Sequence, residues 1–223
     1  MEPKTVLLNT PQQARSRDSW NRVLEAGERI LETSGYKGFT IGAVCREASV
    51  SVDAIYARVS GKDALFLAVY ENALAEMAVG QDALDDSMTL DALPIDELVR
   101  RAVTVVADIF LERAGFVRSI VLLSGSHEAV RQHGSEWTRE LGHRFARLLE
   151  RRSTEIPHAD ARFVVDACFR TVFSSIAIHI AYGSDFVSEH GQTDAQFVHE
   201  LCETAVRYLL CEYRAPEPAS DSP

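Results

Sequence analysis

Apolar residues recur at helical spacing through almost the whole chain, and this periodicity constrains the fold more than any other feature. Spacings of three and four residues place such side chains on one face of an amphipathic helix. Alternating β-branched runs are scarce, prolines are few, and glycines mostly end the periodic segments. The sequence therefore predicts an all-α fold of about nine helices. We place them at residues 18–35, 40–47, 52–59, 62–79, 95–113, 115–124, 127–152, 159–182 and 194–213.

The helices divide into a short N-terminal group and a larger C-terminal body. We expect a flexible basic arm at residues 1–17, a three-helix domain at 18–65, a helical domain at 66–214 and a disordered tail at 215–223. The formal net charge is −10, but residues 1–65 carry nine Lys/Arg and eight Asp/Glu, against fourteen and twenty-five in residues 66–223. A nucleic-acid partner is therefore not excluded, because an acidic body leaves only the N-terminal end free to approach phosphate.

Two short helices within residues 40–59 are joined by a tight turn at residues 48–51, which is the arrangement of a helix-turn-helix. Thr40 and Ser51 are the expected N-caps. A recognition helix reads base edges with its N-terminal residues, and hydroxyl, ammonium and free amide groups bind phosphate, as expected for Thr40, Tyr56 and Lys62. The outer side and start of the second helix would present Ser51, Val52, Asp53, Ala54, Tyr56 and Arg58.

Several features follow one another in the segment GYKGFTIGAVCREASVSVDAIYARVSGKDALFLAVYE. An aromatic residue follows Gly35, Thr40 opens a helix, Val44-Cys45-x-x-Ala48 packs it, and Val50-Ser51 makes the turn. Ile55-Tyr56 lies within the recognition helix, and Lys62-Asp63-Ala64-Leu65 opens the next. With these features, residues 18–72 resemble the N-terminal domain of the TetR (tetracycline-repressor) family of bacterial regulators. The resemblance implies that Tyr56 and Lys62 touch phosphates and that the first residues of the recognition helix read bases.

Four positions depart from the family pattern. Ser49 stands where Gly is common, so the turn must accommodate a Cβ atom. Asp53 replaces a small residue, Val59 an aromatic residue, and Gly61 a common Ser. Asp53 could accept a hydrogen bond from a cytosine amino group or could repel phosphate, whereas Val52 could pack on a thymine methyl. These changes leave the operator sequence open.

The resemblance also implies that the larger domain binds a small-molecule effector and forms a homodimer. Residues 159–182 and 194–213 are apolar on two sides, as helices are when they pack on their own core and on a second subunit, although two central core helices would look the same. We expect an interface that includes Phe163, Ala167, Phe197, Leu201, Ala205 and Tyr208. We expect an apolar pocket among Phe110, Phe116, Leu122, Trp137, Phe173 and His179, each of which could instead be plain core.

Other kinds of site find little support. Cys45, Cys168, Cys202 and Cys211 are scattered without a CxxC pair, so reduced, buried thiols are expected, with no metal and no cofactor. No stretch of about eighteen apolar residues is present, and the N-terminal apolar run is too short for a signal peptide, so we expect a cytoplasmic protein with no membrane partner. Ser124 lies close to His127, but P-loop, GxGxxG and GxSxG motifs are missing, so enzyme chemistry is not expected.

These observations favour a ligand-responsive DNA-binding transcriptional regulator. We expect a repressor that a small, largely apolar effector releases from a palindromic operator on double-stranded DNA. Two alternatives stay open: a constitutive DNA-binding dimer whose C-terminal domain binds no ligand, and a small helical enzyme or carrier.

Overall fold

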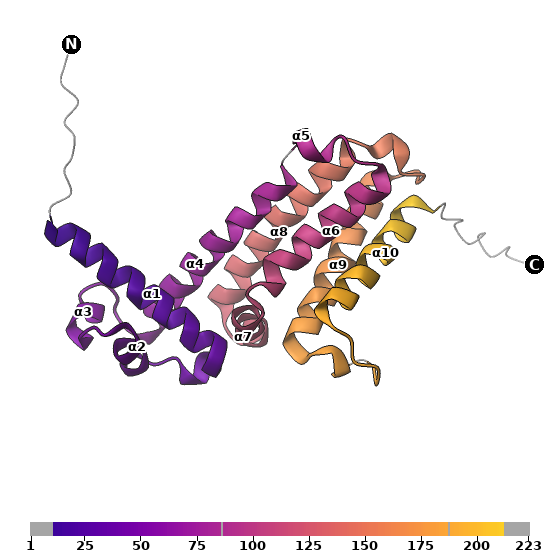
Figure 1. The fold of residues 1–223 in the computed structure, drawn as a ribbon. Coiled ribbons are helices and arrows are strands. Elements are labelled where there is room, and N and C mark those ends of the chain that lie inside the picture. Colours follow the sequence, from indigo (N-terminus) through magenta and orange to yellow (C-terminus); the bar gives the residue numbers. More distant parts are fainter. Residues whose placement is uncertain (1–10, 86, 187, 212–223) are drawn as a thin grey trace, which may run out of the picture. The chain divides into compact units, whose positions relative to one another are not determined.

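The structure, a computed structural model, describes residues 11–85, 87–186 and 188–211, and every element in these ranges is helical (Figure 1). All nine expected helices are present there, and α5, a single turn of four residues, is additional. The α-helices are α1 (Pro11–Gly38), α2 (Ile41–Ala48), α3 (Val52–Tyr56), α4 (Lys62–Gln81), α5 (Ser87–Leu90), α6 (Ile95–Leu111), α7 (Ala114–Ser124), α8 (Glu128–Glu150), α9 (Ala161–Tyr182) and α10 (Asp194–Leu210). Short 3-10 turns lie at Asp82–Leu84, Ser153–Glu155 and Ser184–Phe186.

The helices form two compact units. The first unit contains α1, α2, α3, α4 through Glu76 and the segment Gly115–Val130 with α7, and the second contains the other helices. The expected boundary after residue 65 is therefore displaced in two places, because residues 66–76 and 115–130 pack with the helix-turn-helix.

Burial in the first unit explains why α4 and α7 belong to it. The α4 side chains Phe66 and Tyr70 are 0% and 1% exposed, and Phe116 of α7, 1% exposed, lies 6.4 Å from the Tyr70 ring. The Ser119 hydroxyl of α7 donates a hydrogen bond of 2.6 Å to the Leu31 carbonyl of α1. Removing these helices would expose several aromatic rings to water, which is unfavourable.

Helix α1 is longer than the sequence predicts. It begins at Pro11, so residues 11–17, which the sequence assigns to a flexible arm, are helical, whereas residues 1–10 lie outside the described part. Proline is favoured in a first helical turn because its ring fixes φ and its missing N–H would have no partner there. Gly35, with φ 60° and ψ −171°, marks a kink near the end of the helix, as its tolerance of positive φ predicts. The expected tail at 215–223 also lies outside the described residues.

The segment at residues 80–94 is not the polar loop that its composition indicates. Helix α4 continues through Gly80 to Gln81, and Leu84 and Leu90 are then buried within the second unit. A Cβ atom at Gly80 would lie 2.8 Å from Cγ1 of Ile109 in α6. Gly80 therefore permits a close approach of two helices instead of ending one, and the buried leucines anchor the connection.

Helix α6 lies at the centre of the second unit. Nine of its residues are buried, and it packs against both α9 and α10. Arg100 of α6 links to Asp96 at 2.6 Å and to Glu203 of α10 at 2.8 Å, which fixes the register of the two helices. Among the described residues, α9 alone is long and apolar enough to cross a membrane, although this is weak evidence because core helices of soluble proteins pass the same test.

Candidate nucleic-acid interface

The helix-turn-helix is held together by side-chain caps at both helix starts. Thr40 Oγ1 accepts a hydrogen bond of 3.1 Å from the Ala43 amide at α2, and Ser51 Oγ accepts one of 3.2 Å from the Ala54 amide at α3. Caps of this kind satisfy amides that lack a partner within the helix. Both caps were predicted from the sequence, and the structure confirms them.

Ser49 closes α2 in the left-handed conformation, with φ 54° and ψ 48°. It is the one non-glycine residue with positive φ in the described part of the chain. Its amide bonds the carbonyls of Cys45 and Arg46, so the turn keeps its hydrogen bonds. The turn thus accommodates a Cβ atom where glycine would fit with less strain, as the sequence indicates.

The inward and outward faces of the motif separate clearly. Val44, Ala48 and Ile55 are buried at 0%, 3% and 0% exposure, whereas Val52 and Tyr56 are 46% and 53% exposed. Thr40, Ser51, Asp53 and Ala54 are exposed as well. Seven of the eight side chains expected to contact DNA are therefore exposed: Thr40, Ser51, Val52, Asp53, Ala54, Tyr56 and Arg58.

Two of the expected contacts, the exposed Arg58 and the half-buried Lys62, also have partners within the unit. The Arg58 guanidinium carbon lies 5.0 Å from the ring centre of Trp20, and its Nη2 atom donates to the Ser16 carbonyl at 2.6 Å. Lys62 Nζ donates a hydrogen bond of 3.2 Å to the Tyr36 carbonyl and lies 3.9 Å from the centre of the Tyr36 ring. Both cations therefore hold the helix-turn-helix against α1, a role that spacing in the sequence did not reveal.

Tyr36 is the centre of a polar contact at the end of α1. Its hydroxyl donates a hydrogen bond of 2.6 Å to Oδ1 of Asp63, and its ring packs edge-on against Phe66 at 4.9 Å. Desolvation by burial, followed by the hydrogen bond and the negative charge of Asp63, raises the pKa of Tyr36 to about 12. The hydroxyl therefore stays protonated near neutral pH and continues to fix the start of α4.

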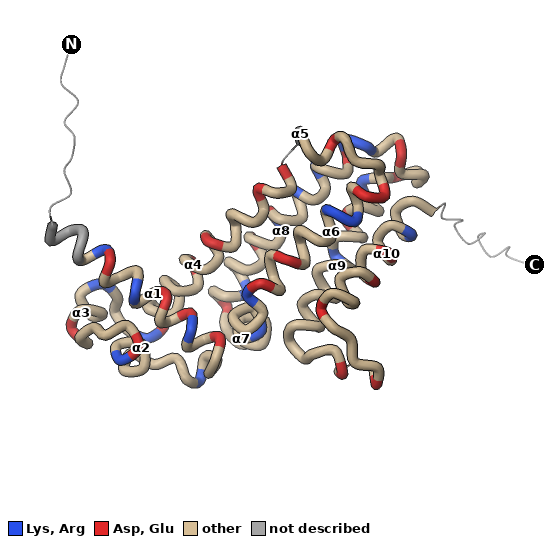
Figure 2. The backbone as a smooth tube through the Cα atoms, viewed as in Figure 1, with Lys and Arg blue, Asp and Glu red and all other residues tan. Residues whose placement is uncertain are grey.

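Other cations of the first unit remain available for phosphate. Arg17, Arg22, Lys37 and Arg46 are exposed, and no hydrogen bond or ion pair of theirs is found among the described residues. Arg29 differs, because it pairs with Glu47 of α2 at 3.0 Å. Figure 2 shows basic and acidic residues interspersed along α1. The sequence signal for these four cations was weak, since scattered basic residues on a helix are usually just solvated.

The expected effector residues fall into three groups. The Phe110 ring lies 5.7 Å from Trp137 and 5.6 Å from Phe173, so three of them form one aromatic cluster in the second unit. Phe116 and Leu122 belong to the first unit, where Phe116 is buried and Leu122 is 52% exposed.

His179, the sixth expected effector residue, has its own partners. Its ring stacks on Phe197 at 4.0 Å, and its Nε2 atom lies 2.9 Å from Oδ1 of Asp194. This is the satisfied histidine that the sequence left open as an alternative to a ligand contact.

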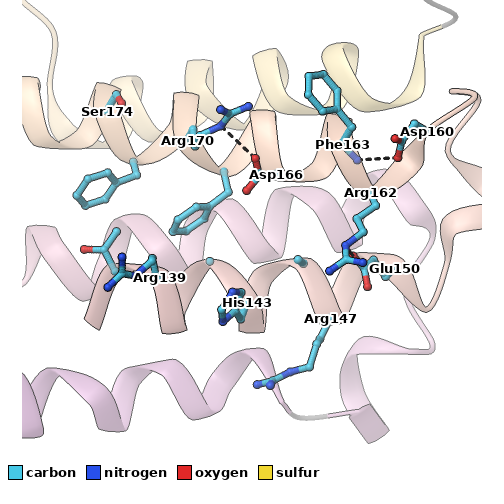
Figure 3. Close-up of a pocket in the computed structure, with 15 residues that line it drawn as sticks. Arg139, His143, Arg147, Glu150, Asp160, Arg162, Phe163, Asp166, Arg170 and Ser174 are labelled. Carbon is cyan, nitrogen blue, oxygen red and sulfur yellow. Dashed lines mark hydrogen bonds and ion pairs between the residues drawn. The ribbon is translucent and has the colours of Figure 1, made fainter. Parts of the chain in front are cut away.

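A groove of about 950 Å³ runs between α8 and α9 (Figure 3). Phe169 and Phe173, stacked at 6.3 Å, give it an apolar floor that is continuous with the Phe110–Trp137 cluster. Charged side chains from both helices line the groove, and two of them, Arg162 and Glu150, lie 3.6 Å apart. A Cβ atom at Gly142 would lie 2.8 Å from the Phe169 ring, so glycine allows that ring to pack against α8.

The six residues expected at a dimer interface divide by exposure. Phe163 of α9 and Tyr208 of α10 are 62% and 43% exposed, and Ala167 is half-buried. In contrast, Phe197, Leu201 and Ala205 are buried within the protomer at 9%, 7% and 3% exposure. These last three belong to the core because α10 packs its apolar face against α6 and α9. Exposed apolar side chains that were not expected here include Ile178 and Tyr182 of α9.

The cysteines are all free thiols, and three of them are buried. Burial raises the pKa of Cys168 to about 12 and also raises that of Cys45 and of Cys202. Cys211 is exposed, contrary to expectation, because α10 ends one residue earlier. Within the described ranges, no three His, Cys, Asp or Glu side chains are grouped as metal ligands would be.

Comparison with known proteins covers both units. Residues 23–69 match the family model for bacterial regulatory proteins of the tetR family, and residues 94–209, more than half of the chain, match the model for the tetracyclin repressor-like C-terminal domain. A search of curated protein sequences gave no match.

Solved structures of regulators share the fold. A transcriptional regulator of Rhodococcus sp. RHA1 aligns with a TM-score of 0.64 at 12% identity, over 85% of this chain and 95% of that one. The regulator FadR of Bacillus subtilis in complex with stearoyl-CoA aligns at 0.63 with 13% identity, over 84% and 97%. A TetR-like regulator of Rhodococcus sp. RHA1 aligns at 0.62 with 18% identity, over 87% and 97%. At sequence identities this low, these comparisons show a shared fold alone.

The two family models and the helix-turn-helix geometry agree with each other. Both models describe parts of one kind of transcriptional regulator, and no part of either is an enzyme domain. The chain belongs to the TetR family of bacterial transcriptional regulators.

Proposed function

We propose that this regulator acts as a cytoplasmic homodimeric repressor, which a small, largely apolar effector releases from a palindromic operator. The main support for DNA binding is the set of exposed side chains on α3. Their helix is held at its start by the Ser51 cap. Side chains at the start of a recognition helix reach base edges in the major groove.

The exposed residues differ in what they can contact. The hydroxyls of Thr40 and Tyr56 suit phosphate oxygens, which position the protein without reading sequence. The Val52 methyl groups suit a thymine methyl, and the Asp53 carboxylate suits a cytosine amino group, so these two residues would set the base preference.

A footprinting experiment on the DNA that flanks the gene, repeated over genomic fragments, tests the proposal. We expect a protected palindrome whose affinity falls steeply between two salt concentrations, because bound cations are released from the phosphates. Tyr56→Phe should weaken binding to all duplexes, whereas Val52→Ala should change which base is preferred. Val79→Ala, the same substitution at a valine that is 70% exposed on α4, serves as the matched control. If no palindrome is protected, DNA binding is refuted.

The dimer is supported by the exposed apolar side chains of α9 and α10. Phe163, Ile178 and Tyr182 are 62%, 41% and 50% exposed, so α9 leaves three large apolar side chains in contact with water. Two such faces related by a twofold axis would cover each other and would present two recognition helices to one palindrome. Sedimentation should show a dimer that Ile178→Glu converts to a monomer, whereas Val79→Glu should leave it intact. A monomeric parent protein would contradict this part of the proposal.

The aromatic cluster and the adjoining groove support an apolar effector. Ligand pockets are mostly apolar with a few polar groups. The groove between α8 and α9 has this character, because Phe173 contributes to its apolar floor and charged side chains line its edge. A ligand releases DNA only if it binds the released state more tightly than the DNA-bound state.

Stearoyl-CoA is a reasonable first probe, because it is bound to the Bacillus subtilis regulator of similar fold. In a Trp20→Phe background the emission reports on Trp137, which contacts Phe110. We expect the probe to change this emission and to weaken operator binding. If a series of acyl-CoA and other apolar probes changes neither, the alternative of a constitutive dimer is favoured.

A further inference from the structure

The recognition helix α3 is short and mostly exposed, and this makes one contact to α1 important. The helix has five residues, and Ile55 is its one buried side chain. A helix of this length is not stable in isolation. Its orientation therefore depends on tertiary contacts. A small cavity of about 190 Å³ lies between α1 and α3, with Trp20, Val23, Ala54 and Ala57 among its lining residues. The edge between the two helices is therefore partly open to solvent.

Arg58 spans this cavity. It follows α3 by two residues, its guanidinium lies over the Trp20 ring at 5.0 Å, and its Nη2 atom donates to the Ser16 carbonyl at 2.6 Å. Nη2 also bonds the Ser16 hydroxyl. A planar guanidinium can stack on a ring and donate in its own plane at the same time, which a lysine ammonium cannot do.

We propose that Arg58 is a positioning residue that fixes the orientation of α3 through Trp20 and Ser16, and not a ligand of DNA phosphate. The first turns of α1 thereby become part of the DNA-reading unit. This inference rests on the proposed function, because it states how the same surface is oriented.

The two roles predict different effects on DNA binding. Loss of a phosphate contact weakens binding to specific and random duplexes alike and reduces the slope of log K against log salt by about 0.9. Loss of a positioning contact leaves that slope unchanged, because no counterion is involved. It lowers affinity for the specific site more than for random DNA, because base contacts need a fixed helix whereas phosphate contacts tolerate displacement.

The experiment measures affinity for the duplex protected by footprinting, and for a random duplex of equal length, at four salt concentrations. Arg58→Ala and Trp20→Ala should each reduce specific affinity roughly 2- to 30-fold with an unchanged salt slope. The double variant should bind no more weakly than Arg58→Ala alone, because that variant has already lost the contact to Trp20. Arg58→Lys should fail to restore specificity, whereas Trp20→Phe should restore part of it because a ring is retained. Arg46→Ala removes an exposed cation of α2 that is available for phosphate, so it should reduce the salt slope and serves as the comparison for loss of a phosphate contact.

A second readout does not depend on DNA. The chain has two tryptophans, so a Trp137→Phe background isolates the emission of Trp20. Arg58→Ala should shift that emission while helical circular dichroism stays unchanged, which separates loss of the contact from loss of the fold. A smaller salt slope in Arg58→Ala together with a neutral Trp20→Ala would overturn the positioning role. Failure of the parent protein to bind any duplex would instead refute the proposed function.

Discussion

Ser49→Gly should stabilise the protein, although most substitutions destabilise. Ser49 adopts φ 54° and ψ 48° at the end of α2, and a left-handed backbone costs a residue with a Cβ atom about 1–2 kcal/mol. Glycine removes this strain but adds freedom to the unfolded chain, which costs about 0.4–1 kcal/mol. The midpoints of these two ranges predict a gain of about 0.8 kcal/mol in the free energy of unfolding, and no packing is lost because the Ser49 side chain is exposed.

Urea unfolding followed by circular dichroism measures this gain, and the melting temperature should rise by about 1–4 °C. Two controls separate backbone strain from other effects. Ser49→Ala keeps the Cβ atom and should leave stability nearly unchanged. Ser60→Gly makes the same substitution at an exposed serine without positive φ and should destabilise by about 0.4–1 kcal/mol. If both glycine variants lose stability equally, strain at Ser49 is not the cause and the reasoning is refuted.

Further predictions concern single side chains. Thr40→Ala should lower the free energy of unfolding by about 1 kcal/mol in urea, because the amide of Ala43 loses its cap, whereas Thr40→Ser should not. Brief alkylation of the native protein should modify Cys211 alone among the four cysteines, as peptide mass mapping would show; equal labelling of Cys168 would contradict its burial. The folded pKa of Tyr36 is raised to about 12 from 10.0, so its stabilising effect is present below pH 10 and is lost as pH rises from 10 to 12. In an absorbance titration, Tyr36→Phe should therefore lack one tyrosine that ionises near pH 12 in the parent protein. If the high-pH part of the titration curve is unchanged, the raised pKa does not belong to Tyr36.

The sequence by itself determined the helical fold and the local chemistry of the motif. The periodicity of apolar residues locates all nine expected helices, since one face of each helix must be buried. The caps Thr40 and Ser51 and the strained turn at Ser49 were also readable, because each depends on residues only a few positions apart. The exposure of Val52 and Tyr56 follows from the same periodicity.

Contacts between distant residues were decided by the tertiary structure alone. Arg58 and Lys62 look like free cations in sequence, but each meets an aromatic ring of α1 supplied by Trp20 or Tyr36. Nothing local encodes a pairing across so many residues, because it depends on how helices pack and not on spacing along one helix.

Burial on α10 and the domain boundary have the same origin. Leu201 is apolar and lies on a helix apolar on two sides, which is why the sequence placed it at the interface. Packing against the rest of the unit buries it in the protomer core instead. The segment 115–130 follows α6 in the chain but packs with the helix-turn-helix unit. An apolar face in the sequence shows that a residue must be covered, and only the fold decides which part of the molecule covers it.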